Sequence, residues 1–279
     1  MSSKLSLNTK TVNSCTVPEA VELCRATGIE SIGLWREPVA EYGLAATVDL
    51  VTAAGLRVSS LCRGGWFTAT GPAFDEAIAS NRAAIEEASA LKADCLCLVV
   101  GGLPDGSKDL MGARDQVARA LEILVPYATN LGVKLALEPM NPIYAADRGV
   151  LSTLGQALDL AAPYTADQVG VMIDTFHVWW DPTLQQQIQR AGDEGRILSY
   201  QVCDWITPLP ADTLLARGMM GDGHIDFPTI GRWVAEAGYT GDIEVEIFNA
   251  DIWAAEPRGV VDTMISRYEE LCAPYAAIR

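Results

Sequence analysis

Short apolar runs alternate with longer amphipathic segments along the whole chain. The apolar runs cover residues 5–8, 31–35, 56–62, 95–100, 134–139, 169–174, 197–205 and 242–248. The helix-like segments that follow them cover residues 18–27, 39–54, 72–91, 110–131, 153–162, 184–191, 229–237 and 257–275. Apolar runs of this length, rich in Val, Ile and Leu, are typical of strands buried on both faces of a parallel sheet. The pattern therefore predicts eight βα units.

Eight βα units favour a closed barrel over an open doubly wound sheet. An open nucleotide-binding sheet would want a glycine-rich phosphate turn after the first strand, where this chain has NTKTVNS. Glycine also stands between a helix-like segment and the next run, where a C-terminal helix cap is expected. These glycines are Gly28, Gly55, Gly132, Gly170 and Gly238. We therefore predict an α/β fold, a (β/α)8 TIM barrel, as one domain spanning residues 1–279.

Composition narrows the function classes. The 279 residues carry a net charge of −16, and 49% of them are hydrophobic, enough for a large core. Such an acidic chain repels phosphate backbones and anionic lipids, so we expect no nucleic-acid partner and no membrane partner. The opening MSSKLSLNTKTVNS lacks the apolar core of a signal peptide, and the seven cysteines are scattered within apolar segments. Both features predict a cytoplasmic protein with buried, reduced thiols.

Four of the predicted strands end in a polar, ligand-type residue. These residues are Glu138, Asp174, Gln201 and Glu246, on the fifth to eighth runs. The carboxyl ends of parallel barrel strands meet at one face, so the four side chains should lie close together. Three carboxylates and an amide oxygen form a hard ligand set that suits Mn²⁺ or Mg²⁺ better than Zn²⁺. We predict a metal site there, with Mn²⁺ as the expected cofactor and Mg²⁺ or Co²⁺ as alternatives.

Glu244 and Glu246 have different predicted roles. Strand alternation puts both on the same face, one layer apart. Glu246, nearer the mouth, is the better ligand. For Glu244 we favour pairing with an arginine deeper in the barrel over a role in supporting the metal ligands.

Several motifs resemble one known superfamily. LALEPMNP, VMIDTFHVW, YQVCDW, GDGHIDF and EVEIF are similar to the sugar isomerase/epimerase barrels, and the similarity spans residues 5–275. These xylose isomerase-like proteins include ketose 3-epimerases, hydroxypyruvate isomerase and inosose dehydratase, with endonuclease IV as a relative. The resemblance implies that Glu138, Asp174, Gln201 and Glu246 hold the metal. This chain departs from the pattern at Gln201, where most members have histidine.

The resemblance also implies a mechanism. A metal that chelates the substrate carbonyl and its neighbouring hydroxyl stabilises an enediolate, while Glu138 and Glu246 act as catalytic groups that move the proton. Return of the proton to the opposite face gives an epimer, and return to the adjacent carbon gives an isomer. Loss of a β-substituent instead gives elimination, so an isomerase and a lyase share the first steps.

Further residues are candidates for substrate binding. The resemblance assigns His177 to the substrate, although a capping or packing role remains an alternative. Arg217 could orient a hydroxyl or oxyanion or form a rim salt bridge, and His224 lies in a glycine-rich turn near the mouth. Six of the seven tryptophans fall at or just after strand ends: Trp35, Trp66, Trp179, Trp180, Trp205 and Trp253. Such an aromatic collar, with Trp35, Trp66 and Trp205 as substrate-binding candidates, suits a substrate larger than a triose or tetrose.

The leading hypothesis is a divalent-metal-dependent isomerase or epimerase of a sugar or keto-sugar. The first alternative is a lyase or dehydratase acting on a 3-keto-glycoside, a C-glycoside or an inosose, and the next is a non-catalytic sugar-binding or partner subunit. An endonuclease is excluded by two histidines and the acidic charge. No phosphate cradle is evident, which favours a non-phosphorylated small carbohydrate, although Arg36 or Arg63 could contradict this. A homo-oligomer is allowed by the resemblance, but no surface patch in the sequence indicates one.

Overall fold

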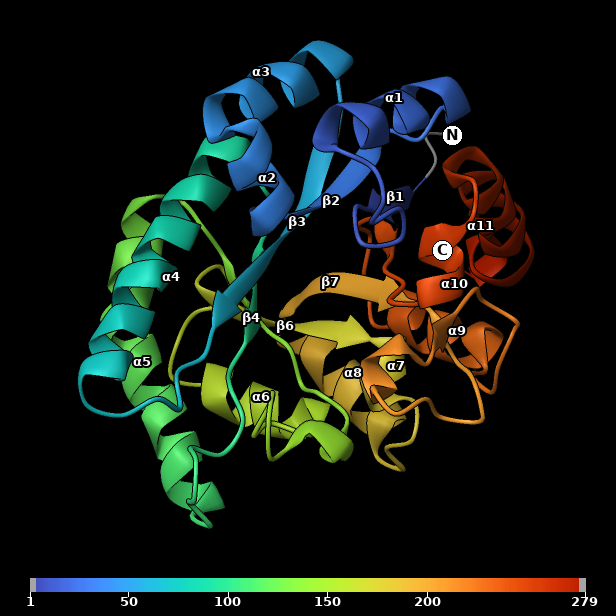
Figure 1. Ribbon diagram of the computed structural model, residues 1–279. Helices are drawn as coiled ribbons and strands as arrows, with labels where there is room; N and C mark the ends of the chain where they lie inside the picture. The colour runs from blue at the N-terminus through green and yellow to red at the C-terminus, as the bar shows by residue number, and fades with distance from the viewer. Residues whose placement is uncertain (1–3, 276–279) are drawn as a thin grey trace.

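The computed structural model describes residues 4–275, and these form a closed parallel barrel surrounded by helices (Figure 1). The barrel strands are β1 (Leu5–Asn8), β2 (Ser31–Trp35), β3 (Arg57–Gly65), β4 (Leu96–Val99), β5 (Leu135–Leu137), β6 (Val169–Asp174), β7 (Ile197–Val202) and β10 (Ile243–Val245). They close in the order β1-β10-β7-β6-β5-β4-β3-β2, with every neighbouring pair parallel. The predicted (β/α)8 barrel is confirmed.

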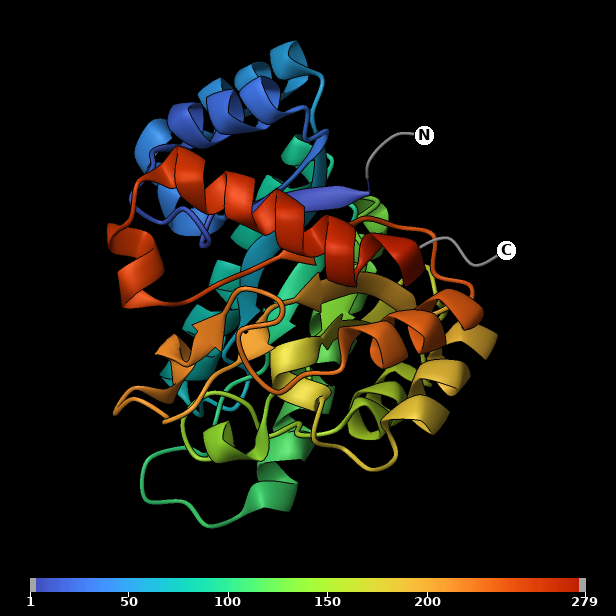
Figure 2. The same cartoon turned by 90° about the vertical axis from the view of Figure 1, so that its right-hand side faces the viewer.

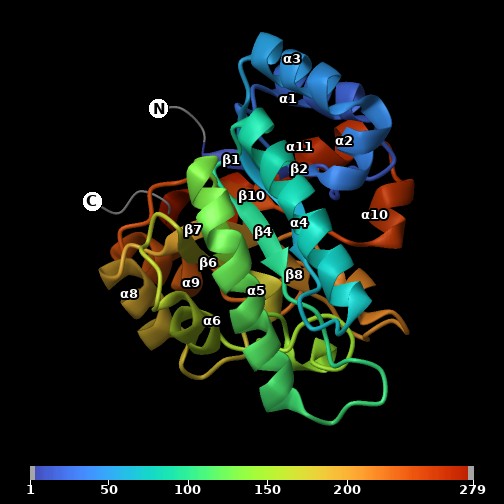
Figure 3. The same ribbon diagram turned by 90° about the vertical axis from the view of Figure 1, so that its left-hand side faces the viewer.

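Helices form an outer layer around the barrel. They are α1 (Val17–Thr27), α2 (Arg36–Tyr42), α3 (Leu44–Ala54), α4 (Pro72–Leu91), α5 (Leu110–Asn130), α6 (Leu154–Ala161), α8 (Leu184–Asp193), α9 (Phe227–Glu236) and α11 (Pro257–Leu271). Figure 2 shows α11 beside α1, which brings the two ends of the described chain together. Figure 3 shows α4 and α5 side by side across the opposite flank. Two short helices, α7 (Thr175–Val178) and α10 (Ala250–Ala254), lie at the carboxyl end of the barrel after β6 and β10.

Two predicted elements are divided in the structure. The predicted helix 39–54 is two helices, because Gly43 at φ 100° interrupts the chain between α2 and α3. The predicted strand 197–205 leaves the barrel after Val202. Its last residues form β8 (Asp204–Trp205), which pairs antiparallel with β9 (Arg217–Gly218) in a small separate ribbon.

Four of the five predicted glycine caps are confirmed. Gly28, Gly55, Gly132 and Gly238 follow helices with φ between 69° and 85°, a conformation that favours glycine. The prediction for Gly170 was wrong, because this residue lies within β6. A Cβ atom there would stand 2.4 Å from the backbone oxygen of Arg196, so glycine permits close packing at that position.

Most of the apolar core is one large cluster formed by the strands and the surrounding helices. A second, smaller cluster on the barrel strands consists of Cys62, Cys95, Cys97, Ala136 and Met172. All seven cysteines are free and all except Cys15 are buried, which agrees with the expected buried thiols. Among residues 4–275 no helix is long and apolar enough to cross a membrane.

Candidate active site

The barrel brings the four polar strand ends to one side of its carboxyl face. Glu138 follows β5, Asp174 ends β6, Gln201 lies near the end of β7 and Glu246 follows β10. These strands are consecutive neighbours in the barrel, and Asp174 pairs in register with Gln201. All four side chains are buried. The placement agrees with the sequence prediction, while their role as ligands stays a prediction.

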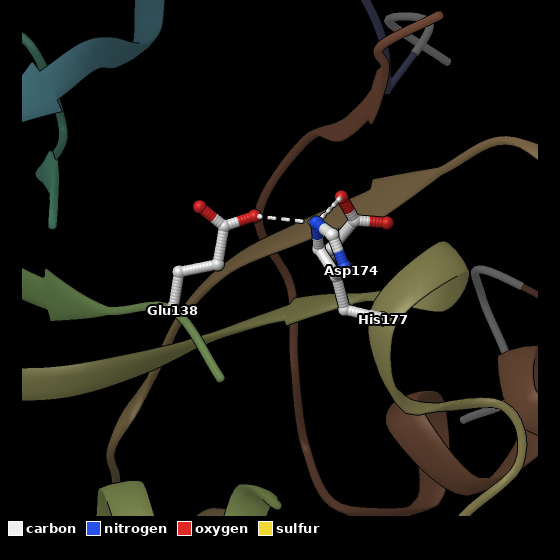
Figure 4. A group of neighbouring side chains, drawn as sticks. All are labelled: Glu138, Asp174 and His177. Atoms are coloured by element: carbon white, nitrogen blue, oxygen red, sulfur yellow. Dashed lines mark ion pairs between the residues drawn. The ribbon is translucent and has the colours of Figure 1, made fainter. Parts of the chain in front are cut away.

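Glu138, Asp174 and His177 form a buried cluster suited to a metal ion (Figure 4). His177 Nε2 lies 3.7 Å from Glu138 Oε1 and 3.8 Å from Asp174 Oδ2. One ligand atom from each of the three residues lies within 4.8 Å of the others. His177 reaches this position because the short helix α7 turns its side chain back over the end of β6. This is a candidate divalent-metal site.

Arg217 is placed at the centre of the site by the β8–β9 ribbon. Its guanidinium is 2% exposed, and Nη1 donates to Asp174 Oδ2 at 2.8 Å and to Glu246 Oε2 at 3.1 Å. Nη2 lies 3.0 Å from His177 Nε2. The Nε atom of Arg217 has no hydrogen-bond partner among the described residues. An unpaired buried donor costs free energy, so this N–H is suited to bind an oxygen of a ligand.

His177 is held as a neutral ring. Burial and the nearby Arg217 lower its pKa well below the usual value. Its Nδ1 is 3.2 Å from the Asn141 N–H, and its Nε2 faces Arg217. A neutral imidazole accepts a hydrogen bond at only one nitrogen, so Asn141 and Arg217 compete for that role. One of these donors is thus left for another acceptor, such as a substrate oxygen.

Glu244 pairs with neutral groups and not with an arginine, so that prediction was wrong. Its carboxylate accepts hydrogen bonds from four side chains, those of Asn8, Ser59, Ser60 and Gln201. A Cβ at Gly33 would lie 2.4 Å from Glu244 Oε1, so only glycine leaves room for this carboxylate. Hydroxyl and amide donors satisfy a buried carboxylate without a second buried charge.

Burial dominates the electrostatics of the two glutamates. It raises the pKa of Glu138 to about 8, with added repulsion from Asp174 and Glu246. It raises the pKa of Glu246 to about 7, with partial relief from the Arg217 guanidinium. Burial also raises the pKa of Asp174. Two carboxyls that titrate near neutral pH in one cavity are suited to exchange protons with a substrate.

The residues present fit a divalent cation. Gln201 Nε2 donates to Glu244, and its Oε1 is buried without a hydrogen-bond partner in the described chain. An unpaired amide oxygen beside carboxylates is a ligand that hard cations accept. Arg217 supplies one positive charge to Asp174 and Glu246, and none of its nitrogens is within hydrogen-bond distance of Glu138.

A cavity of about 320 Å³ opens above these groups. Its lining includes six of the predicted site residues: Trp35, Trp66, Glu138, His177, Arg217 and Glu246. Asp174 and Gln201 lie beneath them and do not line it. Trp35, Trp66 and Phe248 form apolar parts of the wall. The combination of carboxyls, an arginine and aromatic rings suits a small polyhydroxylated molecule.

Fewer tryptophans line the cavity than the predicted aromatic collar contained. Trp35 lines the cavity and donates its Nε1–H to Glu246 Oε1 at 3.0 Å, and Trp66 is 40% exposed at the mouth. Trp205 instead packs against Phe176, with ring centroids 4.7 Å apart, and does not line the cavity. His224 is exposed and bonds Thr207, outside the cavity lining.

Sequence reasoning missed three groups that touch the glutamates. Asn8 donates to both Glu244 and Glu246. It ends β1, so the rule that found the other polar strand ends could have found it. Cys97 Sγ lies 3.2 Å from Glu138 Oε2, and Cys62 Sγ lies 3.9 Å from Glu246 Oε1. The two thiols stand in apolar runs, and no sequence signal distinguished them from core cysteines.

Comparisons with known proteins agree with this barrel. The family model for the xylose isomerase-like TIM barrel matches residues 20–268. A crystal structure of a protein from Sinorhizobium meliloti is 46% identical, with a TM-score of 0.94, and the match covers 98% of this chain and 99% of that one. The chain therefore belongs to the xylose isomerase-like TIM barrel family. No curated protein matches it.

More distant structures share the fold. An IOLI protein with a bound zinc atom has a TM-score of 0.79 at 19% identity, covering 98% of this chain and 99% of that one. D-psicose 3-epimerase from Clostridium cellulolyticum, determined with D-tagatose, has a TM-score of 0.76 at 15% identity, covering 95% and 97%. A sugar epimerase thus shares this fold, and another protein of the same fold binds zinc.

Proposed function

We propose that the protein is a divalent-metal-dependent isomerase or epimerase of a small sugar or keto-sugar. The observation that carries this proposal is the pair Glu138 and Glu246, two buried carboxyls with pKa values near neutrality that line one cavity. The D-psicose 3-epimerase neighbour supports the substrate class, because its structure was determined with a ketose.

The reaction begins with a C–H bond next to a carbonyl. One of the two glutamates, in its carboxylate form, takes the proton from that carbon, and the electron pair moves onto the carbonyl oxygen to give an enediolate. Arg217 offers its unpaired Nε–H to the negative oxygen. The neutral His177 ring orients a hydroxyl beside it.

The second step returns a proton to carbon. The other glutamate, in its protonated form, delivers it to the opposite face of the same carbon and gives an epimer. Delivery to the adjacent carbon gives the aldose–ketose isomer. Glu138 and Glu246 suit these roles because both carboxyls are buried and line the same cavity. Burial raises the pKa of both groups in the metal-free protein, and a bound cation would favour their carboxylate forms.

Glu138, Asp174, Gln201 and Glu246 would hold the divalent ion, with Mn²⁺ as our first choice and Mg²⁺ or Co²⁺ as alternatives. His177, which lies beside Glu138 and Asp174 in the buried cluster, would contact the substrate instead of the ion. When bound, the ion supplies Lewis-acid stabilisation of negative charge on a substrate oxygen. Gln201 contributes the oxygen left without a partner in the structure.

A lyase acting by β-elimination is the second candidate. A further cavity of about 460 Å³, lined by Asn13, Ser14 and Tyr42, shares Lys10 and Glu37 with the first. Such a neighbouring space would accommodate a leaving group. Removal of the same proton, followed by loss of a β-alkoxyl with a proton from the second glutamate, would give the elimination product.

The test is proton exchange in D₂O followed by NMR. The protein with Mn²⁺ is incubated with ketoses and 3-keto-glycosides, in parallel with Glu246→Gln and the exposed control Glu236→Gln. Deuterium entering a ketose next to its carbonyl, lost in Glu246→Gln and kept in Glu236→Gln, supports the isomerase. Release of the aglycone without a rearranged ketose supports the lyase. No exchange with any substrate contradicts both.

A further inference from the structure

Arg63 is a cation at the cavity wall that lacks an acidic partner. It lies in β3 and lines the 320 Å³ cavity together with Glu138 and Glu246. Its guanidinium carbon lies 4.8 Å from the Trp66 ring centroid and 6.0 Å from that of Trp35. Between residues 4 and 275, no hydrogen bond or ion pair engages its N–H groups. Arg63 therefore has unpaired donors, contacts both aromatic rings, and lines both this cavity and a neighbouring one of about 250 Å³.

This lack of a partner is unusual for a cavity arginine in such an acidic chain. The sequence has 36 acidic and 20 basic residues. The other two arginines of the same cavity are paired, Arg217 with Asp174 and Glu246, and Arg148 with Asp147 at 3.5 Å. Glu37 also lines the cavity, but it is exposed and forms no ion pair with Arg63. Despite the excess of acids, no carboxylate in the described chain pairs with Arg63, so its donors are available to an anion from outside.

Lys10 adds a second cation on the same indole ring. Its Nζ lies 4.8 Å from the Trp35 ring centroid and donates to the neutral Asn13 Oδ1 at 3.0 Å. Trp35 in turn donates its Nε1–H to Glu246. The Trp35 side chain thus contacts both cations and Glu246.

The position of Arg63 is built into the backbone. Just after it, Gly65 has a φ of 121°, and a Cβ there would stand 1.7 Å from the Val99 oxygen. Trp66 follows with a φ of 59°, a conformation that side-chain-bearing residues rarely adopt, and its N–H is bonded to the Val99 oxygen at 2.9 Å. This turn at Gly65 and Trp66 places the Trp66 ring against the Arg63 side chain.

We propose that Arg63, assisted by Lys10, is a subsite for an anionic group, and that the substrate is a carbohydrate carrying a carboxylate or a phosphate. This inference rests on the proposed function, because it names the substrate class of the same cavity. The guanidinium binds two anion oxygens through parallel N–H bonds, and the Trp35 and Trp66 rings contact the sugar C–H face. The anion then fixes which carbon of the substrate faces Glu246.

The test compares matched probes by titration calorimetry on the metal-loaded protein. The probes are sorbitol, gluconate and sorbitol 6-phosphate, which share a six-carbon chain and differ in the terminal group. We expect at least one of the two anions to bind about tenfold or more tightly than sorbitol, as for charge-assisted hydrogen bonds to one guanidinium. Preference for gluconate alone identifies a sugar acid, and preference for sorbitol 6-phosphate alone identifies a sugar phosphate.

The variants separate Arg63 from other causes of anion binding. Arg63→Gln should reduce the affinity for the preferred anion to that for sorbitol, while Arg82→Gln should not. Arg82 is the matched control because it lies over Tyr127 on the outer helices. Equal affinity for all three probes overturns the proposal, and so does an anion preference that survives Arg63→Gln, since the bound metal would then be its source.

The anion-binding test and the deuterium-exchange test can fail independently of each other. Deuterium exchange into a neutral ketose without any anion preference leaves the isomerase intact and rejects the subsite. Anion binding that depends on Arg63 without exchange in any anionic or neutral substrate supports the subsite and rejects the isomerase.

Discussion

Gln201 Nε2 donates a hydrogen bond of 2.8 Å to Glu244 Oε1, and the oxygen of the same Gln201 amide has no partner in the described chain. The two residues are register neighbours in β7 and β10. The Gln201 side chain therefore has two roles. Its nitrogen holds the Glu244 carboxylate in place, and its oxygen is available to a cation.

Replacing Gln201 by leucine should weaken metal binding. The variant loses the amide oxygen, and we expect the affinity for Mn²⁺ measured by calorimetry to fall by about 10- to 100-fold, as when groups that support a bound metal are removed. Gln201→His should retain a ligand atom and bind more tightly than Gln201→Leu. The exposed helix residue Gln186 supplies the control Gln186→Leu. Unchanged affinity in a folded Gln201→Leu protein would show that this amide is not a ligand.

The metal-free protein should lose stability as the pH rises. Burial raises the pKa of Glu138 to about 8 and that of Glu246 to about 7, so the folded protein binds these protons more tightly than the unfolded chain. Their contribution is fully present below the unfolded glutamate pKa of about 4.3. It is lost as the pH rises through about 7 and 8.

Thermal unfolding in EDTA measures this effect. We expect the midpoint to fall across this pH range, and to fall less in Glu138→Gln, whose amide stays neutral. Glu236→Gln should follow the unsubstituted protein. A midpoint as pH-dependent in Glu138→Gln as in the unsubstituted protein would mean that Glu138 ionises with an ordinary pKa.

Arg217→Met should destabilise the metal-free protein strongly. Asp174 and Glu246 would lose the cation that both contact, and an uncompensated buried charge costs about 3–5 kcal/mol. Added Mn²⁺ should restore part of the loss. Urea unfolding provides the measurement, with Arg258→Met as a control, since Arg258 and Asp262 are a half-exposed pair worth at most about 1 kcal/mol. Equal effects of the two substitutions would refute the central role of Arg217.

Asp204→Asn should loosen the loop that carries His224. The buried Asp204 carboxylate accepts hydrogen bonds from the backbone N–H groups of Gly221, Gly223 and Ile225 at 2.8–3.0 Å. Replacing a charged acceptor by an amide should cost about 1.5–3 kcal/mol. Hydrogen exchange at the three amides should accelerate. Asp222→Asn, in the same loop, should leave them protected, because the Asp222 carboxylate pairs with the surface Arg267.

The barrel was predictable because its strands are buried on both faces and therefore read as uninterrupted apolar runs. The rule for polar strand ends located Glu138, Asp174, Gln201 and Glu246 for the same reason. Gly170 was misassigned, since a glycine required for close packing in a strand looks the same in sequence as a helix cap.

The partners of these carboxylates were harder to predict. Nothing in the sequence around Glu244 indicates whether its carboxylate pairs with an arginine or with serine, asparagine and glutamine side chains. Trp205 stands at a strand end like Trp35, yet it packs on Phe176, because the chain leaves the barrel after Val202. Both the partners of Glu244 and the packing of Trp205 depend on contacts between elements that are far apart in the sequence.

The β8–β9 ribbon has a consequence for how this protein could change its specificity. The carboxylates belong to barrel strands, whose register every other strand depends on. Arg217 belongs to the two-residue strand β9, which lies outside the barrel and pairs with β8. The carboxylates of the site are therefore fixed by the barrel strands, whereas the arginine that pairs with them lies on a ribbon outside the barrel. A new ribbon grafted between Cys203 and Gly223 would change the chemistry without changing the strand register, provided that it supplies a cation to Asp174 and Glu246.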